Sequence, residues 1–406
     1  MGRRQDTSGW GGNGRSGSVA RVLEALRSDG PSSQAALARR TRLSPATINN
    51  IVKQLRAEGA AEIRPVNGRE SVVSLVSSRG VVVSVQVNVT SLHAALFDFV
   101  HRARYDVTIP FSPGHEGGSP ARVIEVVRSL VAEAGLETGD LTGVAVGMQA
   151  PIARPTGVVT SWARLQLPRW KDVVVADHLG AELGVPVVAD NDANLAALAE
   201  WTWGAGQGTD TFLYVLSSEQ VGGGLVLGGR IHRGGDGLAG EIGHAVLEPG
   251  GPVCFCGNRG CLTTFVAERP ILATLEAAAG TRASSLADVI SAARGGDPAC
   301  ARVLFEAGRH LGRAFANAAK LVAPSVIAVG GLLGEAGELV FDGLNSSVEI
   351  SNLRTVAPTL SVQLARLGAD ATLLGGLAAM MDHLGQGLSV LPEWAKTTSA
   401  ARSFSN

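Results

Sequence analysis

Residues 240–261 read GEIGHAVLEPGGPVCFCGNRGC and hold three of the four cysteines of the chain. His244 precedes Cys254, Cys256 and Cys261, so one imidazole and three thiols fall in one short segment. This is the donor set of a tetrahedral zinc site. A Cys-x-Cys pair is poorly placed for a mutual disulfide. We therefore predict that these four residues bind zinc, with three unrelated thiols as the alternative.

The predicted zinc has a structural role. Four protein ligands fill a tetrahedral ion and leave no open position for an activated water. The remaining cysteine, Cys300, lies at the expected start of a helix and is interpreted as a buried, inert thiol.

The composition is that of a globular protein with two or three domains. The chain has 406 residues, of which 45% are hydrophobic and 17% charged. Few aromatics (4%) and 52 glycines favour an α/β architecture. The longest apolar run, residues 321–333, is interrupted by Pro324 and by Gly330-Gly331, and the N-terminal residues have no apolar core typical of a signal peptide. We therefore expect a cytoplasmic protein without a transmembrane helix.

The charge is distributed unevenly along the chain. Residues 1–70 contain 12 Lys and Arg and 6 Asp and Glu, whereas the rest of the chain contains 23 and 30 out of totals of 35 and 36. A basic head on an acidic body indicates that the head meets a polyanion such as DNA.

The head has the pattern of a winged helix-turn-helix. Helices are predicted from Ser18 to before Gly30, from Ser33 to Arg40, and from Ser44-Pro45 to Gly59, with serine caps and proline at the first helical position. Two short strands then flank the hairpin turn Asn67-Gly68.

The third helix is the expected DNA-recognition helix. Its apolar residues lie on one side and leave small and amide side chains on the other, which suit the major groove. Arg69, beside the hairpin turn, is placed to reach phosphate or the minor groove. The alternative is a three-helix module that binds protein. The predicted DNA contacts are Ala46, Thr47, Asn49, Asn50, Lys53 and Arg69.

The body shows a repeated pattern of paired apolar strands followed by helices. It begins near Gly80 and recurs near Thr211, which predicts two related α/β lobes with a cleft between them. The strand at residues 185–189 runs into Asp190-Asn191-Asp192, at the kind of strand end where small ligands bind. Asp192 could act as a general base or accept a hydrogen bond; alternatively, Asp192 or Asn194 caps the following helix.

With Asn191-Asp192, GEIGH at 240–244 and CFCGNRGC at 254–261 in this order, the chain resembles the ROK family of repressors and sugar kinases. The added winged helix makes it similar to the xylose and N-acetylglucosamine repressors of that family. The resemblance implies an actin-like, sugar-kinase-type body of two ribonuclease-H-like lobes. It also implies that one nitrogen of His244 binds zinc while the other faces the sugar. The implied sugar contacts are Asn191, Asp192, Glu241 and His244.

The chain departs from the kinase members of the family at both phosphate loops. Their Asp-x-Gly-Gly-Thr loop is replaced by residues 86–90, QVNVT, and their Gly-Thr-Gly-x-Gly loop by residues 218–222, SEQVG. Glu219 would place a carboxylate near a bound triphosphate. We therefore expect no catalytic residues and no kinase activity.

Two departures concern the sugar itself. Thr263 stands where the family usually has a sugar-binding glutamate, and Ala150 where it often has glycine. A neutral hydrogen bond is weaker than a charge-assisted one, so sugar binding is expected to be weaker, altered or lost.

The sequence thus predicts a basic disordered tail (1–17), a winged helix-turn-helix (18–77), a body (78–385, with lobes 78–195 and 196–385) and a C-terminal tail (386–406). The predicted function is that of a homodimeric or tetrameric transcriptional regulator of carbohydrate-related genes, of the repressor type. It would bind an inverted-repeat operator and respond to a sugar or sugar derivative. The alternatives are a sugar kinase with a DNA-binding head and a regulator that has lost its sugar response.

Overall fold

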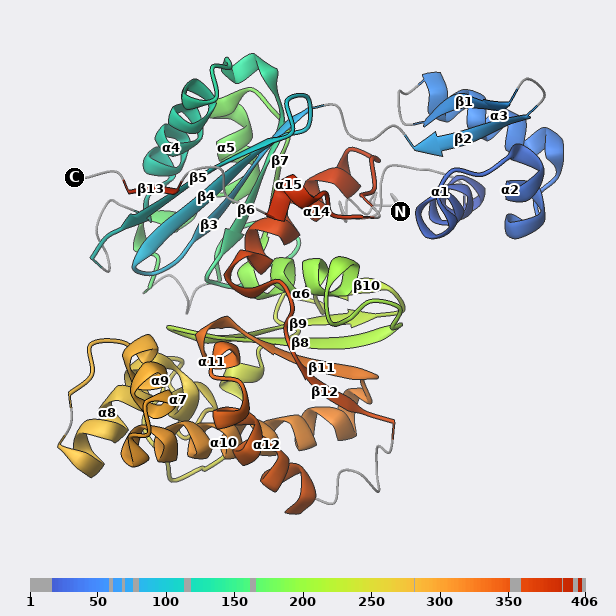
Figure 1. Ribbon diagram of the computed structural model, residues 1–406. Coiled ribbons are helices and arrows are strands. Elements are labelled where there is room, and N and C mark those ends of the chain that lie inside the picture. The colour runs from blue at the N-terminus through green and yellow to red at the C-terminus, as the bar shows by residue number, and fades with distance from the viewer. Residues whose placement is uncertain are drawn as a thin grey trace, which may run out of the picture.

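The computed structural model consists of a small N-terminal head and a two-lobed body (Figure 1). It describes residues 17–57, 61–67, 70–75, 80–112, 118–160, 166–280, 282–350, 359–388, 390–396 and 401–403. The tail expected at 1–17 lies outside these residues except for Gly17. No described helix combines the length and apolar character needed to cross a membrane.

The head contains three helices and a hairpin, as the sequence predicted. The elements are α1 (Gly17–Asp29), α2 (Gln34–Thr41), α3 (Pro45–Ala57), β1 (Ala61–Asn67) and β2 (Glu70–Leu75). The Ser33 side chain caps α2 by accepting from the Ala36 N–H at 3.2 Å, and Ser44 accepts from the Thr47 N–H at 3.1 Å. β1 and β2 pair in antiparallel register. The serines therefore cap the first turns of α2 and α3 and fix where each helix begins.

The first lobe is built on a six-stranded sheet of order β13-β5-β4-β3-β6-β7. Its strands β3, β4 and β5 form an antiparallel meander, and β6 and β7 continue parallel to β3. Helices α4 and α5 cover one face (Figure 1). The bounds are β3 (Val81–Val87), β4 (Ser91–Asp98), β5 (Ala103–Pro110), α4 (Pro120–Glu133), β6 (Leu141–Met148), α5 (Val175–Leu183), β7 (Val187–Asn191), α6 (Asp192–Trp203) and β13 (Ala401–Ser403).

The second lobe repeats this topology. Its sheet has the order β10-β9-β8-β11-β12, which matches β5-β4-β3-β6-β7 strand for strand. The bounds are β8 (Thr211–Ser217), β9 (Val221–Leu227), β10 (Arg230–His232), α7 (Thr263–Val266), α8 (Glu268–Ala279), α9 (Leu286–Arg294), α10 (Pro298–Val322), β11 (Val326–Gly330), α11 (Gly331–Glu335), α12 (Glu338–Ile350) and β12 (Ser361–Leu364). The predicted duplication into two ribonuclease-H-like lobes is therefore present.

Helix α14 (Ala371–His383) returns to the first lobe, although the expected range 196–385 placed it in the second. It is apolar nearly all round, and its leucines and methionines pack with Val82, Phe97 and Ala145 of the first sheet. Together with α6 it fills the space between the two sheets (Figure 1). An apolar helix of this kind is stable only between two covering surfaces.

The segment assigned to a C-terminal tail also packs on the first lobe. Leu391 and Ala395 are buried, and α15 (Glu393–Lys396) contributes Trp394, whose ring meets Phe99 edge to face at 5.0 Å. The buried Arg104 side chain donates to the Ala395 carbonyl at 2.9 Å, and β13 pairs with β5. The body therefore extends beyond residue 385 because apolar side chains and a buried guanidinium require this cover.

Candidate ligand-binding cleft and metal centre

A cavity of about 270 Å³ lies between the two lobes. This is near the lower end of the roughly 300–1,000 Å³ typical of small-molecule sites. The four residues predicted to contact sugar all line it, together with residues of both segments that stand in place of the phosphate loops. The lining includes Gln86, Asn88, Gln149, Ala150, Asn191, Asp192, Glu219, Gln220, Glu241, His244 and Phe255. One cavity thus joins a side near Asp192, here called the sugar side, to a side near Glu219, here called the phosphate side.

Asp192 and Asn191 lie where β7 ends and α6 begins. Asn191 caps the helix, since its side-chain oxygen accepts from the Asn194 N–H at 3.2 Å, so neither Asp192 nor Asn194 is the cap. The Asp192 Oδ1 accepts from the Ala193 N–H at 2.8 Å and from the Asn191 amide at 3.1 Å. Among the described residues, the Asp192 Oδ2 has no such partner, so this oxygen is available to a ligand.

Burial shifts the charge state of the two carboxyl groups on the sugar side. The pKa of Asp192 is raised to about 7 by burial. The pKa of Glu241 is also raised to about 7, first by burial and then by the negative charge of Asp192. Near neutral pH both carboxyls can therefore donate or accept a hydrogen bond, which suits the hydroxyls of a sugar.

An ion pair between the lobes holds the strand end that presents these groups. The Arg233 guanidinium, after β10, donates to Asp190 Oδ2 at 2.8 and 2.6 Å. The other oxygen of Asp190 accepts from the Asn191 N–H at 2.8 Å and the Asn194 amide at 3.1 Å. Arg233 therefore positions the turn from the opposite lobe, a role that no local pattern in the sequence revealed.

The GEIGH segment approaches β9 closely through its glycines. A Cβ at Gly240 would lie 2.3 Å from the Gly223 oxygen, and one at Gly243 would lie 2.1 Å from the Val221 oxygen. Only glycine permits this approach, which brings Glu241 and His244 to the cavity wall. His244 ends a short 3-10 helix, Ile242–His244.

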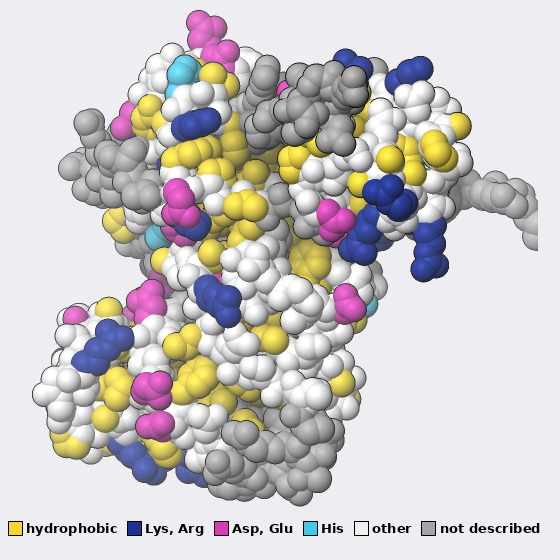
Figure 2. Space-filling view, turned by 45° about the vertical axis from the view of Figure 1, so that its right-hand side comes forward, with side chains coloured by type: hydrophobic (Ala, Val, Ile, Leu, Met, Phe, Trp, Pro, Cys, Tyr) yellow, Lys and Arg dark blue, Asp and Glu magenta, His cyan; other side chains and the backbone are white. Residues whose placement is uncertain are grey.

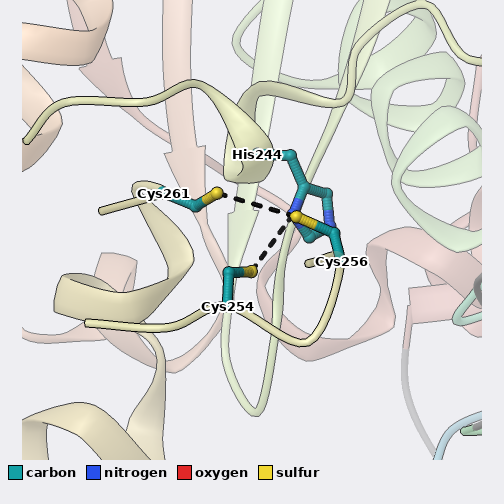
Figure 3. Close-up of side chains that lie close together, drawn as sticks. All are labelled: His244, Cys254, Cys256 and Cys261. Carbon is teal, nitrogen blue, oxygen red and sulfur yellow. Dashed lines mark hydrogen bonds between the residues drawn. The ribbon is translucent and has the colours of Figure 1, made fainter. Parts of the chain in front are cut away.

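His244, Cys254, Cys256 and Cys261 converge as predicted (Figure 3). Their ligand atoms all lie within 4.8 Å of one another. The Cys256 and Cys261 sulfurs are 3.7 Å apart, and the Cys254 sulfur is 3.5 Å from His244 Nδ1. A tetrahedral zinc with Zn–S bonds of about 2.3 Å would separate two sulfurs by about 3.8 Å. Donor types and spacing therefore fit zinc.

The fourth cysteine is separate from this cluster. Cys300 is buried near the start of α10, as expected. Phe255, between two of the metal-site cysteines, was not singled out from the sequence. Its ring meets the His244 ring edge to face at 5.0 Å, and it lines the cavity. The loop of residues 254–261, here called the metal loop, thus supplies an apolar surface to the sugar side as well as holding His244.

The replaced phosphate loops meet each other across the cleft. The Thr90 hydroxyl donates a hydrogen bond to Glu219 Oε1, linking the turn after β3 to the turn between β8 and β9. A carboxylate therefore occupies the region expected for it from the sequence.

Several backbone N–H groups of this region are hydrogen-bonded within the protein. Gln149 Oε1 accepts from the Val89 N–H at 2.8 Å, and the Ser91 carbonyl accepts from the Asn88 N–H at 2.8 Å. Ser218 Oγ accepts from the Leu332 N–H at 3.1 Å, at the turn from β11 to α11 that Gly330 and Gly331 form. Phosphate binding by loops depends on such N–H groups being unpaired and converging. The capping roles of Gln149 and Ser218 were not visible in the sequence.

The predicted DNA-contacting residues share the outer face of α3. Ala46, Asn49, Asn50 and Lys53 are exposed and Thr47 is half-buried, while the apolar residues on the other face of α3 are buried. Lys and Arg side chains gather over the head, at the right of Figure 2. Arg69 lies outside the described residues. The described face is small, polar and basic, as a DNA-reading surface would be.

Thr263 is buried at the start of α7 and is not among the residues that line the cavity. Ala150 does line it. In the described structure, the side chain at position 263, where the family usually has a glutamate, therefore does not line the cavity.

Comparisons with known proteins agree with both parts of the molecule. The model of the ROK family matches residues 82–383, and a model described as winged helix-turn-helix DNA-binding matches residues 20–60. A glucokinase of Halalkalibacterium halodurans is 36% identical over 252 residues, covering 58% of this chain and 75% of that protein.

Two other similar proteins extend over almost the whole chain. A xylose repressor of Caldicellulosiruptor bescii is 23% identical over 381 residues, covering 89% of this chain and 95% of the repressor. A crystal structure of a ROK family transcriptional regulator, a homolog of the E. coli MLC protein, is 26% identical with a TM-score of 0.77. That comparison covers 90% of this chain and 96% of the other.

Proposed function

We propose, because the chain belongs to the ROK family and carries a winged helix-turn-helix, that it is a transcriptional repressor of carbohydrate-related genes whose body senses a sugar. Residues 18–77 would form the DNA-binding domain, and the body after residue 78 would bind the effector. Similarity to a xylose repressor and to a ROK regulator over about nine tenths of the chain supports this assignment.

One observation carries the choice of sensor over kinase. The phosphate side contains the Thr90–Glu219 hydrogen bond, and the Val89 and Leu332 N–H groups are already paired with side chains. A triphosphate would have to displace these bonds and approach a carboxylate, a repulsion of about 1 to 4 kcal/mol per close charge pair. The sugar side, in contrast, keeps polar groups that face the cavity.

The sugar contacts proposed are Asn191, Asp192, Glu241 and His244, all of which line the cavity. Hydrogen bonding by two carboxyls, an amide and an imidazole fits vicinal hydroxyls. The zinc proposed at His244, Cys254, Cys256 and Cys261 would be structural. It would fix the His244 ring through Nδ1, the nitrogen nearest the Cys254 sulfur.

The proposed DNA surface consists of Ala46, Thr47, Asn49, Asn50, Lys53 and Arg69. A homodimer would place two such helices on successive major grooves of an inverted repeat. Sugar binding between the lobes would favour one lobe arrangement and so change the spacing of the two heads.

The experiment is a fluorescence-anisotropy titration of full-length, zinc-loaded protein with DNA fragments from upstream of its own and neighbouring genes. We expect at least one fragment to bind at least a hundredfold more tightly than a shuffled fragment at the same salt concentration. A common monosaccharide should change that affinity. Equal affinity for all fragments would contradict the regulator assignment.

A sugar kinase with a DNA-binding head is the second candidate. The observation in its favour is the higher identity to a glucokinase, 36%, than to a xylose repressor, 23%. An ADP-release assay with hexoses, pentoses and N-acetylated sugars tests it. Sugar-dependent turnover that Asp192→Asn abolishes would establish this activity.

A regulator without sugar input is the third candidate, motivated by threonine at position 263. Thermal unfolding of the zinc-loaded protein with each sugar distinguishes it. A ligand at 100 times its dissociation constant should raise the unfolding free energy by about 2.7 kcal/mol. No shift with any sugar would favour this candidate over the sensor.

A further inference from the structure

Amide side chains line much of the phosphate side of the cavity. The first lobe contributes Gln86, Asn88 and Gln149, and the second lobe contributes Gln220 from the turn between β8 and β9. Ser91 and His93 complete the wall on the first lobe. An amide offers both donors and an acceptor, so this wall can pair with hydroxyl groups in either direction.

Hydrogen bonds among these side chains hold the wall in place. The Gln86 amide nitrogen donates to Asn88 Oδ1 at 3.0 Å, and the Asn88 nitrogen donates to Ser91 Oγ at 3.0 Å. The same Ser91 hydroxyl lies 3.1 Å from His93 Nε2. Within the described part of the chain, Gln86 Oε1 and the Gln220 amide have no hydrogen-bond partner. Both groups are therefore available to a ligand, and Gln86 is also held in position by its bond to Asn88.

The charge of the lining excludes an anionic ligand. Four acidic residues line the cavity, namely Asp192, Glu219, Glu241 and Glu335, and none of the lining residues, all of them described, is Lys or Arg. Burial lowers the pKa of His93, so this imidazole supplies no positive charge at neutral pH. A phosphorylated sugar would therefore meet acidic side chains and no Lys or Arg among the lining residues, whereas a neutral polyhydroxyl group would find hydrogen-bond partners.

We infer that the effector is a neutral glycoside of two sugar units, with the first unit at Asp192 and the second against Gln86 and Gln220. This rests on the proposed sugar-sensing function and extends it to a class of ligand. The second unit would occupy the phosphate side, where the amide wall replaces the N–H groups that a phosphate would need. Because Gln86 and Gln220 come from opposite lobes, a two-unit ligand would bridge them directly.

Isothermal titration calorimetry on the full-length, zinc-loaded protein tests this with matched pairs. The pairs are glucose with cellobiose and with maltose, xylose with xylobiose, and N-acetylglucosamine with its β-1,4 dimer. Glucose 6-phosphate serves as the anionic probe. For at least one pair the two-unit sugar should bind at least tenfold more tightly than the single unit. Glucose 6-phosphate should not bind.

Variants locate the second unit. Gln220→Ala and Gln86→Ala should each reduce the affinity ratio of two-unit to single-unit sugar at least fivefold. Gln220 is a suitable first choice, because in the described structure its side chain makes no hydrogen bond whose loss would unfold the protein. Gln207→Ala is the matched control, since Gln207 is exposed and outside the cavity. It should leave the ratio unchanged.

The outcomes separate this inference from the proposed function. Binding of a single sugar with no gain for its two-unit partner would overturn the inference and leave the sensor standing. Tight binding of glucose 6-phosphate would overturn the charge argument and with it the inference. No binding by any sugar would overturn both. A normal ratio in Gln220→Ala and Gln86→Ala would place the second unit elsewhere and so contradict the assignment.

Discussion

The two sides of the cleft differ in what their polar groups already bind. On the sugar side, Asp192 keeps a carboxylate oxygen without a partner among the described residues, and Glu241 lies close enough for their charges to interact. On the phosphate side, Glu219 is hydrogen-bonded to Thr90, and the Val89 N–H is paired with Gln149. The same fold therefore presents one side with a carboxylate oxygen open to the cavity and another side on which the carboxylate of Glu219 and the Val89 N–H are already paired.

Under the proposed function, this difference is how a body with the fold of the sugar kinases would lose nucleotide binding and keep sugar binding. The replacement of glycines in the two phosphate loops is only part of the difference from the kinases. Two backbone donors of this region, the Val89 and Leu332 N–H groups, are capped by side chains, so they are satisfied in the absence of any ligand. A sensor needs only the sugar side and a cleft whose geometry responds to occupancy.

The largest expected effect concerns the metal loop that supports the sugar side. Cys256→Ser removes one of four ligands, so bound zinc should fall well below one per chain. The unfolding free energy should drop by more than about 4 kcal/mol, because loss of a metal is among the strongest destabilising changes. Metal analysis and chemical denaturation measure the two quantities.

Cys300→Ser is the control for this prediction. Cys300 is buried but outside the cluster, so its substitution should leave the zinc content at one per chain. If Cys256→Ser also retains one zinc per chain, the ligand assignment is wrong.

Asp192→Asn should abolish sugar binding and change the pH dependence of stability. In the folded, ligand-free protein the pKa of Asp192 is about 7, against an ordinary value of 3.8. Between these pH values the folded protein keeps a proton that the unfolded chain has released, so the unfolding free energy falls as pH rises from about 4 to 7. Because asparagine does not titrate, Asp192→Asn does not lose unfolding free energy in this way as the pH rises.

Denaturation of both proteins at pH 5 and pH 8 checks this. We expect Asp192→Asn to gain about 1 to 4 kcal/mol relative to the wild type between the two pH values. If the difference in unfolding free energy between Asp192→Asn and the wild type is the same at pH 5 and pH 8, Asp192 is ionised in the folded protein at both pH values.

Gln149→Ala should lower the unfolding free energy of the protein by about 1 to 3 kcal/mol, because it leaves the Val89 N–H on the phosphate side without an acceptor. Gln149→Glu keeps an oxygen at the same position and should recover most of this loss. Thermal denaturation compares the three proteins. Equal stability of Gln149→Ala and the wild type would show that the donor is not effectively capped.

The smallest expected effect lies in the head. Lys53→Ala should weaken DNA binding by about tenfold or less on every fragment and reduce the slope of log affinity against log salt by about 1. Sugar binding should be unaffected, which would separate the head from both sides of the cleft. Anisotropy at several salt concentrations measures the slope, and an unchanged slope would argue against a phosphate contact at this residue.

Local patterns predicted the elements and the metal cluster well. Serine and proline at helix starts and the apolar periodicity are signals contained within a few residues, and the described helices of the head begin where these signals predict. The predicted Asn67-Gly68 turn lies partly outside the described residues, between β1 and β2. The close spacing of Cys254, Cys256 and Cys261 likewise revealed the cluster. These features depend on neighbours in sequence, which is why they could be inferred.

Interactions between distant segments could not be inferred in this way. The Arg233–Asp190 ion pair, the Gln149 cap and the return of α14 to the first lobe join residues far apart in the chain. Arginines and glutamines are common on surfaces, so nothing in their local sequence distinguishes those that meet a buried partner. The C-terminal residues were assigned to a tail for the same reason.

Calorimetric titration of Mg²⁺–AMPPNP, a non-hydrolysable ATP analogue, and of the sugar panel into the same zinc-loaded protein tests the central claim most directly. We expect a saturable heat with at least one neutral sugar and none with the nucleotide, whether or not sugar is present. Saturable nucleotide binding at submillimolar concentration would contradict it, since the phosphate side would then be open.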